Sequence, residues 1–240
     1  MGTLRTKTIE PATGSTLTLG ASGDTITVSS DSIKTNTFKD AGGNTLFTSD
    51  GAGTLSSINS GLVPGGPILI STSTASNVSS VDITSGIDST YDEYMFVCTD
   101  IHSREDDRGF NFQVNAAGQS GFNETITSTY FMAQHYESGT TSTLAYFTNM
   151  DLAQGTGNQK LTHQGNDADQ ASVVILHLFS PASTTYVKHF YFQGSAYQSD
   201  DRNYNAFGAG YINTTAAIDE ISFYMSGGNF DGVIQMYGIK

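Results

Sequence analysis

Short apolar runs alternate with polar turns along the whole chain, and the runs become longer and closer together after residue 67. Segments rich in Val, Ile, Tyr, Phe and Thr with a two-residue apolar period are typical of β-strands, and Gly, Asn and Asp between them are typical of turns. The pattern predicts strands over 67–74, 81–83, 93–101, 109–116, 124–135, 143–147, 171–179, 185–197, 207–213, 219–226 and 231–239. We therefore expect an all-β fold in which residues 68–240 form a jelly-roll-like β-sandwich, the head domain.

One of these strands, VVILHLF at 173–179, is apolar on both faces. Successive side chains of a strand point to opposite sides, so the even-numbered residues share one face and the odd-numbered residues the other. A sandwich strand normally buries only one face against the core. The simplest partner for the second face is a symmetry-related copy of the domain, and we assign Val174, Leu176 and Leu178 to that interface.

The first 60 residues carry a thinner version of the pattern. The runs TLTL at 16–19, TITV at 25–28 and NTLF at 44–47 are short and are bounded by Gly-rich turns. Their few large apolar side chains bury too little surface to offset the entropy of ordering a single chain. We expect a slender homotrimeric β-stalk, like a β-prism or a triple β-helix, in which three copies share one thin core; an unstructured linker is the alternative. The residues assigned to this shared core are Leu46, Phe47, Leu55 and Ile58.

The segment GLVPGGP at 61–67 holds three Gly and two Pro in seven residues, which is typical of a connector. We therefore place the domain boundaries at 1–60 for the stalk, 61–67 for the linker and 68–240 for the head.

Charge excludes some partners. The formal net charge is −13, and residues 67–240 hold six Lys or Arg against eighteen Asp or Glu, a net of −12. A surface this acidic repels phosphate groups, so we expect no nucleic-acid partner and no attraction to an anionic membrane.

Cysteine use and apolar run lengths bear on where the protein is made. Cys98 is the single cysteine, so no disulfide forms within one chain, and its apolar neighbours indicate a buried, inert thiol. The N-terminus has no apolar signal region, and the longest apolar run is too short to span a bilayer. We expect assembly in a cytoplasm, without a signal peptide and without membrane insertion.

No catalytic motif is present. The chain lacks the G-x-S-x-G nucleophile motif, the HExxH zinc motif and the phosphate-loop lysine. Carboxylates cluster in DIHSREDDRGF at 100–110, where a salt-bridged loop, a Ca²⁺ site and a glycan-cleaving pair are alternatives; the salt-bridged loop is favoured because Arg104 and Arg108 lie among the acids. Histidines 177 and 189 lie within apolar strands and are interpreted as structural rather than metal-binding. We expect no enzymatic activity, no cofactor and no metal.

Aromatic and acidic residues gather around QSDDRNYN at 198–205, the pattern of a carbohydrate platform, although ordinary loop packing gives the same pattern. The residues of this candidate glycan site are Tyr197, Asp200, Asp201, Tyr204 and Phe207.

Several segments carry a family resemblance. They are RTKTIEPATGSTLTLGASGDTITV, GGNTLFTSDGAGTLSSINSGL, SGIDSTYDEYMF, HLFSPASTTYVKHF and GYINTTAAIDEISFYMSGGNFDGVIQMYGIK. They resemble virion structural proteins of tailed phages of aquatic bacteria, and most of all short fibre proteins of marine phages. Such modules recur in tail fibres, head fibres and capsid decorations.

The resemblance implies an N-terminal segment that attaches to other phage virion proteins, and a C-terminal domain held outward. The expected function is therefore that of a homotrimeric virion fibre that contacts a glycan or protein of the host surface. The alternatives are a capsid decoration or cement protein, a structural joint of the tail and, third, a glycan depolymerase.

Overall fold

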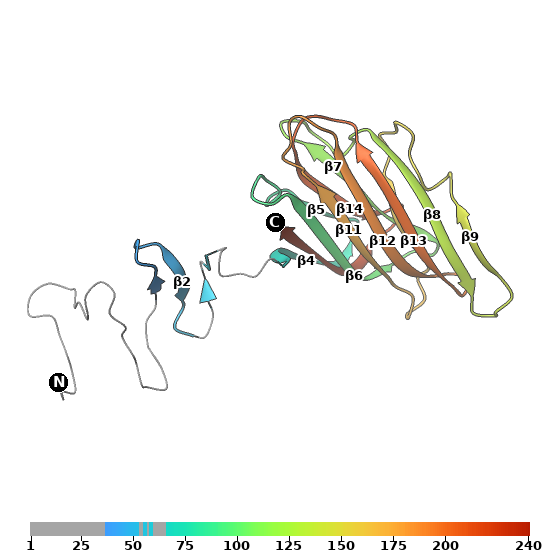
Figure 1. Cartoon of the computed structure of the whole chain (residues 1–240). Coiled ribbons are helices and arrows are strands. Elements are labelled where there is room, and N and C mark those ends of the chain that lie inside the picture. The colour runs from blue at the N-terminus through green and yellow to red at the C-terminus, as the bar shows by residue number, and fades with distance from the viewer. Residues whose placement is uncertain (1–36, 53–54, 57, 60–65) are drawn as a thin grey trace, which may run out of the picture. The chain divides into compact units, whose positions relative to one another are not determined.

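The computed structural model describes residues 37–52, 55–56, 58–59 and 66–240 (Figure 1). The chain divides into two units, residues 1–64 and residues 65–240, and each is described by itself. Every regular element in the described residues is a β-strand, and every strand pairing is antiparallel. The all-β prediction is confirmed.

The described residues of the first unit form a small sheet. Strands β1 (Thr37–Lys39), β2 (Thr45–Ser49) and β3 (Leu55–Ser56) pair in the order β1-β2-β3. The hairpin turn is held by Asp40, whose carboxylate accepts hydrogen bonds from the backbone N–H and the side-chain amide of Asn44, at 2.8 and 3.0 Å. The predicted strand at 44–47 corresponds to β2, whereas the runs at 16–19 and 25–28 lie outside the described residues.

The residues assigned to a shared stalk core are only partly covered within one chain. Leu46 and Phe47 are half-buried, and the ring of Phe47 lies 4.5 Å from that of Phe38 between centroids. Leu55 and Ile58 are 50% and 44% exposed. Their assignment to an interface between copies stays a prediction.

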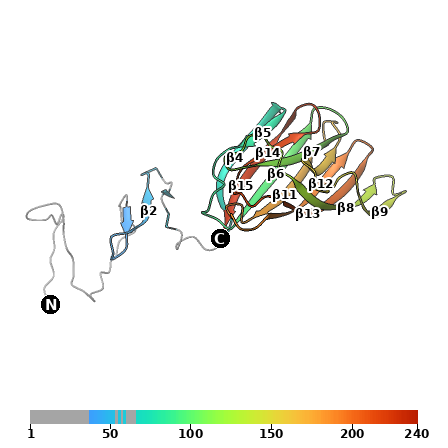
Figure 2. The same ribbon diagram turned by 90° about the horizontal axis from the view of Figure 1, so that it is seen from above.

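The second unit consists of an eight-stranded and a four-stranded sheet. The strand orders are β4-β15-β6-β11-β12-β13-β8-β9 and β10-β7-β14-β5. The strands are β4 (Ile68–Val78), β5 (Ser80–Ile83), β6 (Glu93–Ser103), β7 (Arg108–Ala116), β8 (Ile126–Tyr136), β9 (Ser142–Tyr146), β10 (Gln159–Gln164), β11 (Ser172–Phe179), β12 (Lys188–Gln198), β13 (Arg202–Ile212), β14 (Ile218–Met225) and β15 (Phe230–Ile239). In Figure 2 the strands of the large sheet follow one another from β4 to β9.

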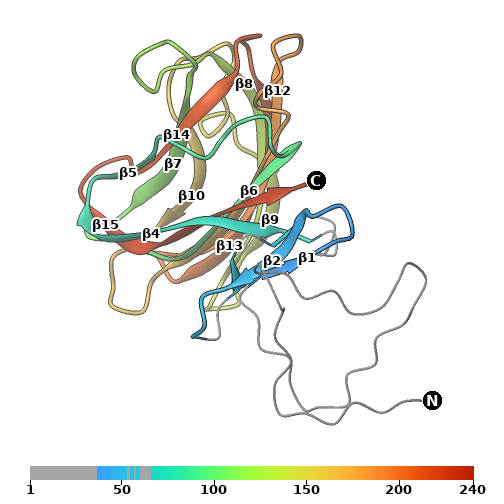
Figure 3. The same cartoon turned by 90° about the vertical axis from the view of Figure 1, so that its left-hand side faces the viewer.

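The core lies between the two sheets, and aromatic rings fill much of it. Figure 3 shows the four-stranded sheet lying over one face of the eight-stranded sheet. Ring contacts join the two layers: Phe96 to Phe223 at 5.5 Å, Phe110 to Phe230 at 5.6 Å and Phe112 to Phe190 at 5.1 Å. The second unit therefore has the layered arrangement of a β-sandwich.

The assignment of Val174, Leu176 and Leu178 to an interface between copies is wrong. All three side chains are at most 1% exposed and belong to the core between the two sheets. The alternation along β11 is as predicted, but the two faces are exchanged. The uncovered face is the odd-numbered one, on which Val173 and Ile175 remain 48% and 43% exposed.

One strand escaped the sequence pattern. Every strand expected after residue 67 is present with shifted ends, and β10, QKLTHQ, is additional. Its buried residues are mostly polar: Gln159, Thr162 and Gln164 are at most 1% exposed. Thr162 bonds Ser172 at 3.1 Å, and the amide of Gln159 donates to the carbonyl of Met150 at 3.2 Å. Hydrogen bonding replaces apolar alternation in this strand.

Candidate functional site

The outward face of strands β8, β11, β12 and β13 is the most distinctive surface of the second unit; we call it the outer face. Its side chains come from alternate positions of four adjacent strands, in register across the sheet. They are Thr127, Thr129, Phe131, Ala133, His135, Val173, Ile175, His177, Phe179, His189, Tyr191, Gln193, Ser195, Tyr197, Asn203, Asn205, Phe207, Ala209 and Tyr211. None of them is Asp, Glu, Lys or Arg, although the domain that carries them has a net charge of −12.

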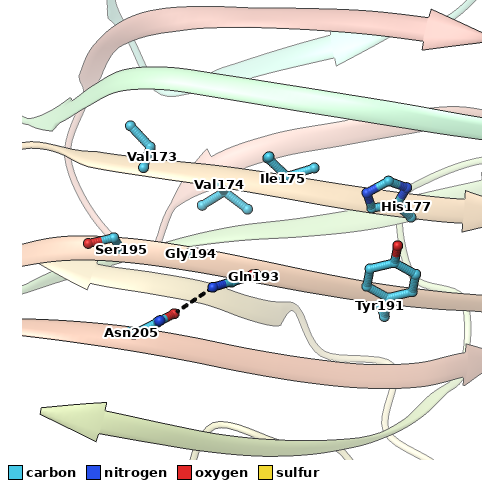
Figure 4. Close-up of a pocket in the computed structure, with 9 residues that line it drawn as sticks. All are labelled: Val173, Val174, Ile175, His177, Tyr191, Gln193, Gly194, Ser195 and Asn205. Carbon is cyan, nitrogen blue, oxygen red and sulfur yellow. Dashed lines mark hydrogen bonds between the residues drawn. The ribbon is translucent and has the colours of Figure 1, made fainter. Parts of the chain in front are cut away.

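A shallow hollow of about 430 Å³ lies at the centre of the outer face (Figure 4). Its apolar side is formed by Val173 and Ile175 on β11, and its aromatic side by His177 and Tyr191. The rings of His177 and Tyr191 stack with centroids 4.5 Å apart and planes 18° from parallel. Nδ1 of His177 bonds the carboxylate of Glu93 on β6, which fixes the imidazole in this stacked position.

A second aromatic group extends the outer face toward the edge of the sheet. The rings of Phe131 on β8 and Phe207 on β13 stack at 5.2 Å with planes 10° apart. Phe131 and Phe207 are direct cross-strand partners, and Tyr146 of β9 pairs with Phe131 on its other side. Tyr146 is 51% exposed and the adjacent Leu144 is 71% exposed. Sequence reasoning missed Phe131, Leu144, Tyr146 and Tyr191.

The predicted glycan residues do not form one platform. Tyr197 lies at the end of β12, where its hydroxyl donates to the carboxylate of Asp201 at 3.2 Å. Asp200 occupies the β12–β13 turn and pairs with Nε of Arg202 at 3.0 Å. Phe207 lies on the outer face, several residues away along β13.

The placement of Tyr204 in an exposed platform is wrong, because this side chain is 1% exposed and faces the core side of β13. The face alternates along β13, so Tyr204 and Phe207 point to opposite sides of the sheet.

The two arginines of the acidic segment at 100–110 are both paired with carboxylates, one within the segment and one outside it. Arg108 Nη2 lies 2.7 Å from the carboxylate of Glu105, and Arg104 donates to Asp231 at 2.9 Å. In the part of the chain that the structure describes, no three His, Cys, Asp or Glu side chains are grouped so as to hold a metal ion. Burial raises the pKa of the Cys98 thiol, which keeps it protonated.

The described residues contain no helix of the length and apolarity needed to cross a membrane. No protein-family model, no curated protein and no solved structure matches this chain.

Proposed function

We propose that the protein is a structural protein of a phage virion, a homotrimeric fibre whose head domain projects from the particle and contacts the host surface. The observation that carries this proposal is the outer face, where exposed aromatic and aliphatic side chains lie among neutral polar ones, without a charged side chain from its four strands, on a strongly acidic domain. Contiguous exposed apolar surface on a folded domain marks a site of association.

A second copy of the same chain is the occupant that fits the outer face best. Cores of protein interfaces are depleted in charged residues and enriched in aromatic ones, as this face is. Two acidic domains repel each other where their carboxylates meet. The side chains that strands β8, β11, β12 and β13 place on the outer face are uncharged, and the carboxylate at its β6 border, Glu93, is bonded to His177, so this surface opposes the approach of a second copy less than the acidic remainder of the domain. Self-association through this face would give the trimer that we expect from the sequence, with heads of jelly-roll type.

The first unit supports the same assembly. Its described strands are two to five residues long, and Leu55 and Ile58 are half-exposed in one chain. Two neighbouring copies would cover these side chains and complete a trimeric β-stalk. A stalk joined to a compact head would be the arrangement of a fibre, and the resemblance to virion proteins of aquatic phages implies that the N-terminal segment attaches to the particle.

Host contact then depends on number rather than on one tight site. Three heads per fibre and several fibres per particle raise the overall avidity by roughly two to four orders of magnitude above that of a single weak contact.

The test of this function is the location of the chain in purified particles that encode it. Electron cryo-microscopy should show threefold projections into which the head fits, at a copy number of a few dozen at most. A lattice of hundreds of copies on the capsid surface would replace the fibre by a cement protein, and absence from the particle would reject both.

A further inference from the structure

A polar cleft of about 630 Å³ lies on the core side of β13, at the β12–β13 turn. Five segments distant in sequence meet there: the β6–β7 turn, β8, the segment after β9, β10 and the β12–β13 turn. The polar residues that line it include Asp106, Asp107, Gln134, His163, Gln198, Asp200 and Arg202. Its volume is in the range of small-molecule sites, which is roughly 300–1,000 Å³.

Arg202 is held rigidly at the centre of this cleft. Its Nε donates to Gln198 at 2.8 Å and lies 3.0 Å from Asp200. Its Nη1 donates to Gln134 at 3.0 Å and to the hydroxyl of Tyr136 at 2.9 Å. Within the described residues Nη2 has no partner, so two N–H donors of a fixed guanidinium remain free for a ligand.

His163 supplies a second donor. Nδ1 of His163 lies 3.1 Å from the side-chain amide nitrogen of Gln198 and 3.3 Å from the carboxylate of Asp107. Because an amide nitrogen can only donate, the neutral ring accepts from Gln198 at Nδ1 and carries its proton on Nε2. Burial lowers the pKa of His163, and Lys160, Arg202 and Arg108 lower it further, while the Asp107 carboxylate opposes them. The ring is therefore neutral at pH 7, with Nδ1 as acceptor and Nε2 as donor.

Tyr204 is a buried residue of the cleft wall with an unused polar group. The side chain is 1% exposed, and its hydroxyl has no hydrogen-bond partner among the described residues. Burial raises the pKa of Tyr204. The charge of Arg202 lowers this pKa and the charge of Asp107 raises it, so the hydroxyl lies within electrostatic reach of both charged groups of the cleft. A buried hydroxyl without a partner is rare in folded proteins and indicates a missing partner.

The charge of the cleft selects against anions. Asp106, Asp107 and Asp200 outnumber the one cation, Arg202, so the net charge of the cleft is −2 when His163 is neutral. The neighbouring turn is acidic as well. The pKa of Tyr197 is raised to about 12, first by desolvation and then by the negative charges of Glu137, Asp201 and Asp169. Phosphate, sulfate and carboxylate ligands are therefore repelled.

The remaining wall is apolar. Met132, Phe147 and Met150 also line the cleft, and Phe147 is only partly buried. The cleft thus offers fixed hydrogen-bond donors beside carboxylate acceptors, and an aromatic ring at one side. The donors and acceptors match a molecule whose neighbouring hydroxyls both donate and accept, and the ring matches its apolar C–H faces.

We infer that this cleft binds an uncharged saccharide of two or three rings, with Arg202, His163 and Tyr204 as donors and Asp107 and Asp200 as acceptors. This inference rests on the host-contact part of the proposed function and names the site and the ligand class for it. The expected acceptor Asp200 belongs to the glycan set predicted from the sequence, whereas His163 and Asp107 come from other segments.

The test uses the full-length chain and three defined trisaccharides. Maltotriose and tri-N-acetylchitotriose represent uncharged ligands, and trigalacturonic acid represents an anion. Calorimetry or ligand-observed NMR should show at least one uncharged trisaccharide binding with a Kd of about 0.1–1 mM, and the acid binding at least about tenfold more weakly.

Two variants and a matched control locate the site. Asp200→Asn should weaken binding at least about fivefold, because the amide presents a donor where the ligand needs an acceptor. Asp201→Asn makes the same change at the next residue, which pairs with Tyr197 outside the cleft, and should change binding less than about twofold. Tyr204→Phe removes a hydroxyl that has no partner, so it should weaken binding while leaving the melting temperature equal or higher.

The inference is overturned if neither uncharged trisaccharide binds at about 10 mM, if the acid binds as well, or if Asp200→Asn and Asp201→Asn have equal effects. Binding to host cells is measured separately. If Asp200→Asn loses the trisaccharide but keeps cell binding, the cleft stands as a saccharide site and the host-contact part of the proposed function fails.

Discussion

His177 of β11 and Tyr191 of β12 stack with ring centroids 4.5 Å apart on a face of the large sheet that the four-stranded sheet does not cover. Tyr191 nevertheless remains 47% exposed. Stacked rings that stay exposed on an uncharged face give a partner a large, rigid contact area at low entropic cost. This pair is the centre of the proposed interface between copies.

The first prediction places a charge at that centre. Tyr191→Asp should lower the self-association constant at least about tenfold, since a carboxylate buried between two acidic heads is both desolvated and repelled. Light scattering after size exclusion measures the change. Tyr186→Asp is the matched control, because Tyr186 is 74% exposed and lies in the loop before β12. Equal weakening by both substitutions would mean that added charge, not the outer face, controls assembly.

The second prediction separates the two faces of β11. Leu176 is fully buried in the sandwich and Ile175 is 43% exposed on the outer face. Leu176→Ala should reduce the free energy of unfolding by about 2–5 kcal/mol, because it leaves a cavity. Ile175→Ala should reduce it by less than about 1 kcal/mol. Chemical denaturation at a concentration where the protein is monomeric gives both values, and the reverse ranking would restore the original assignment of the faces.

The third prediction concerns the glycines of β13. A Cβ on Gly208 would lie 2.2 Å from the ring of Phe192, its cross-strand partner in the core. Gly208→Ala should therefore destabilise the head by about 1–3 kcal/mol through overpacking. Ala209→Ser, on the exposed side of the same strand, should change stability by less than about 0.5 kcal/mol. A thermal melt of each variant is sufficient, and an unchanged Gly208→Ala would show that the ring moves freely.

The fourth prediction follows from the lowered pKa of His163, whose first cause is burial. On acidification the unfolded chain takes up a proton near the ordinary pKa of 6.5, whereas folded His163 does so only at lower pH. The free energy of unfolding therefore falls as the pH drops below 6.5, by at most about 1.4 kcal/mol per pH unit. In His163→Gln the decline between pH 7 and pH 5 should be shallower. Parallel curves for the two proteins would contradict this account.

The local sequence pattern predicts the strands of this fold better than it predicts which face of each strand is exposed. The two-residue period located the strand at 171–179, but it did not decide whether Ile175 or Leu176 faces the core, because both are large and apolar. That choice is made by the four-stranded sheet, which packs from distant segments. Strand β10 escaped because its buried residues, such as Gln159, are satisfied by hydrogen bonds rather than by apolar contacts.

The cleft illustrates a second limit. Asp200 was identified because aromatic and acidic residues lie close together in the sequence around it. His163 and Asp107 reach the same cleft only through the pairing of β10 with β7 and the return of β12 beside β11. The sequence pattern predicts correctly that Tyr204 lies near Asp200, but it predicts an exposed side chain where the structure has a buried one. Successive residues of a strand point to opposite faces, and the local pattern did not show which face Tyr204 takes.

The central claim is that copies of this chain assemble through apolar surface that one copy leaves uncovered. Sedimentation equilibrium of the full-length chain at micromolar concentration measures this directly. We predict a species of three times the 25.5 kDa chain mass. A single folded species of 25.5 kDa across that range would contradict the account.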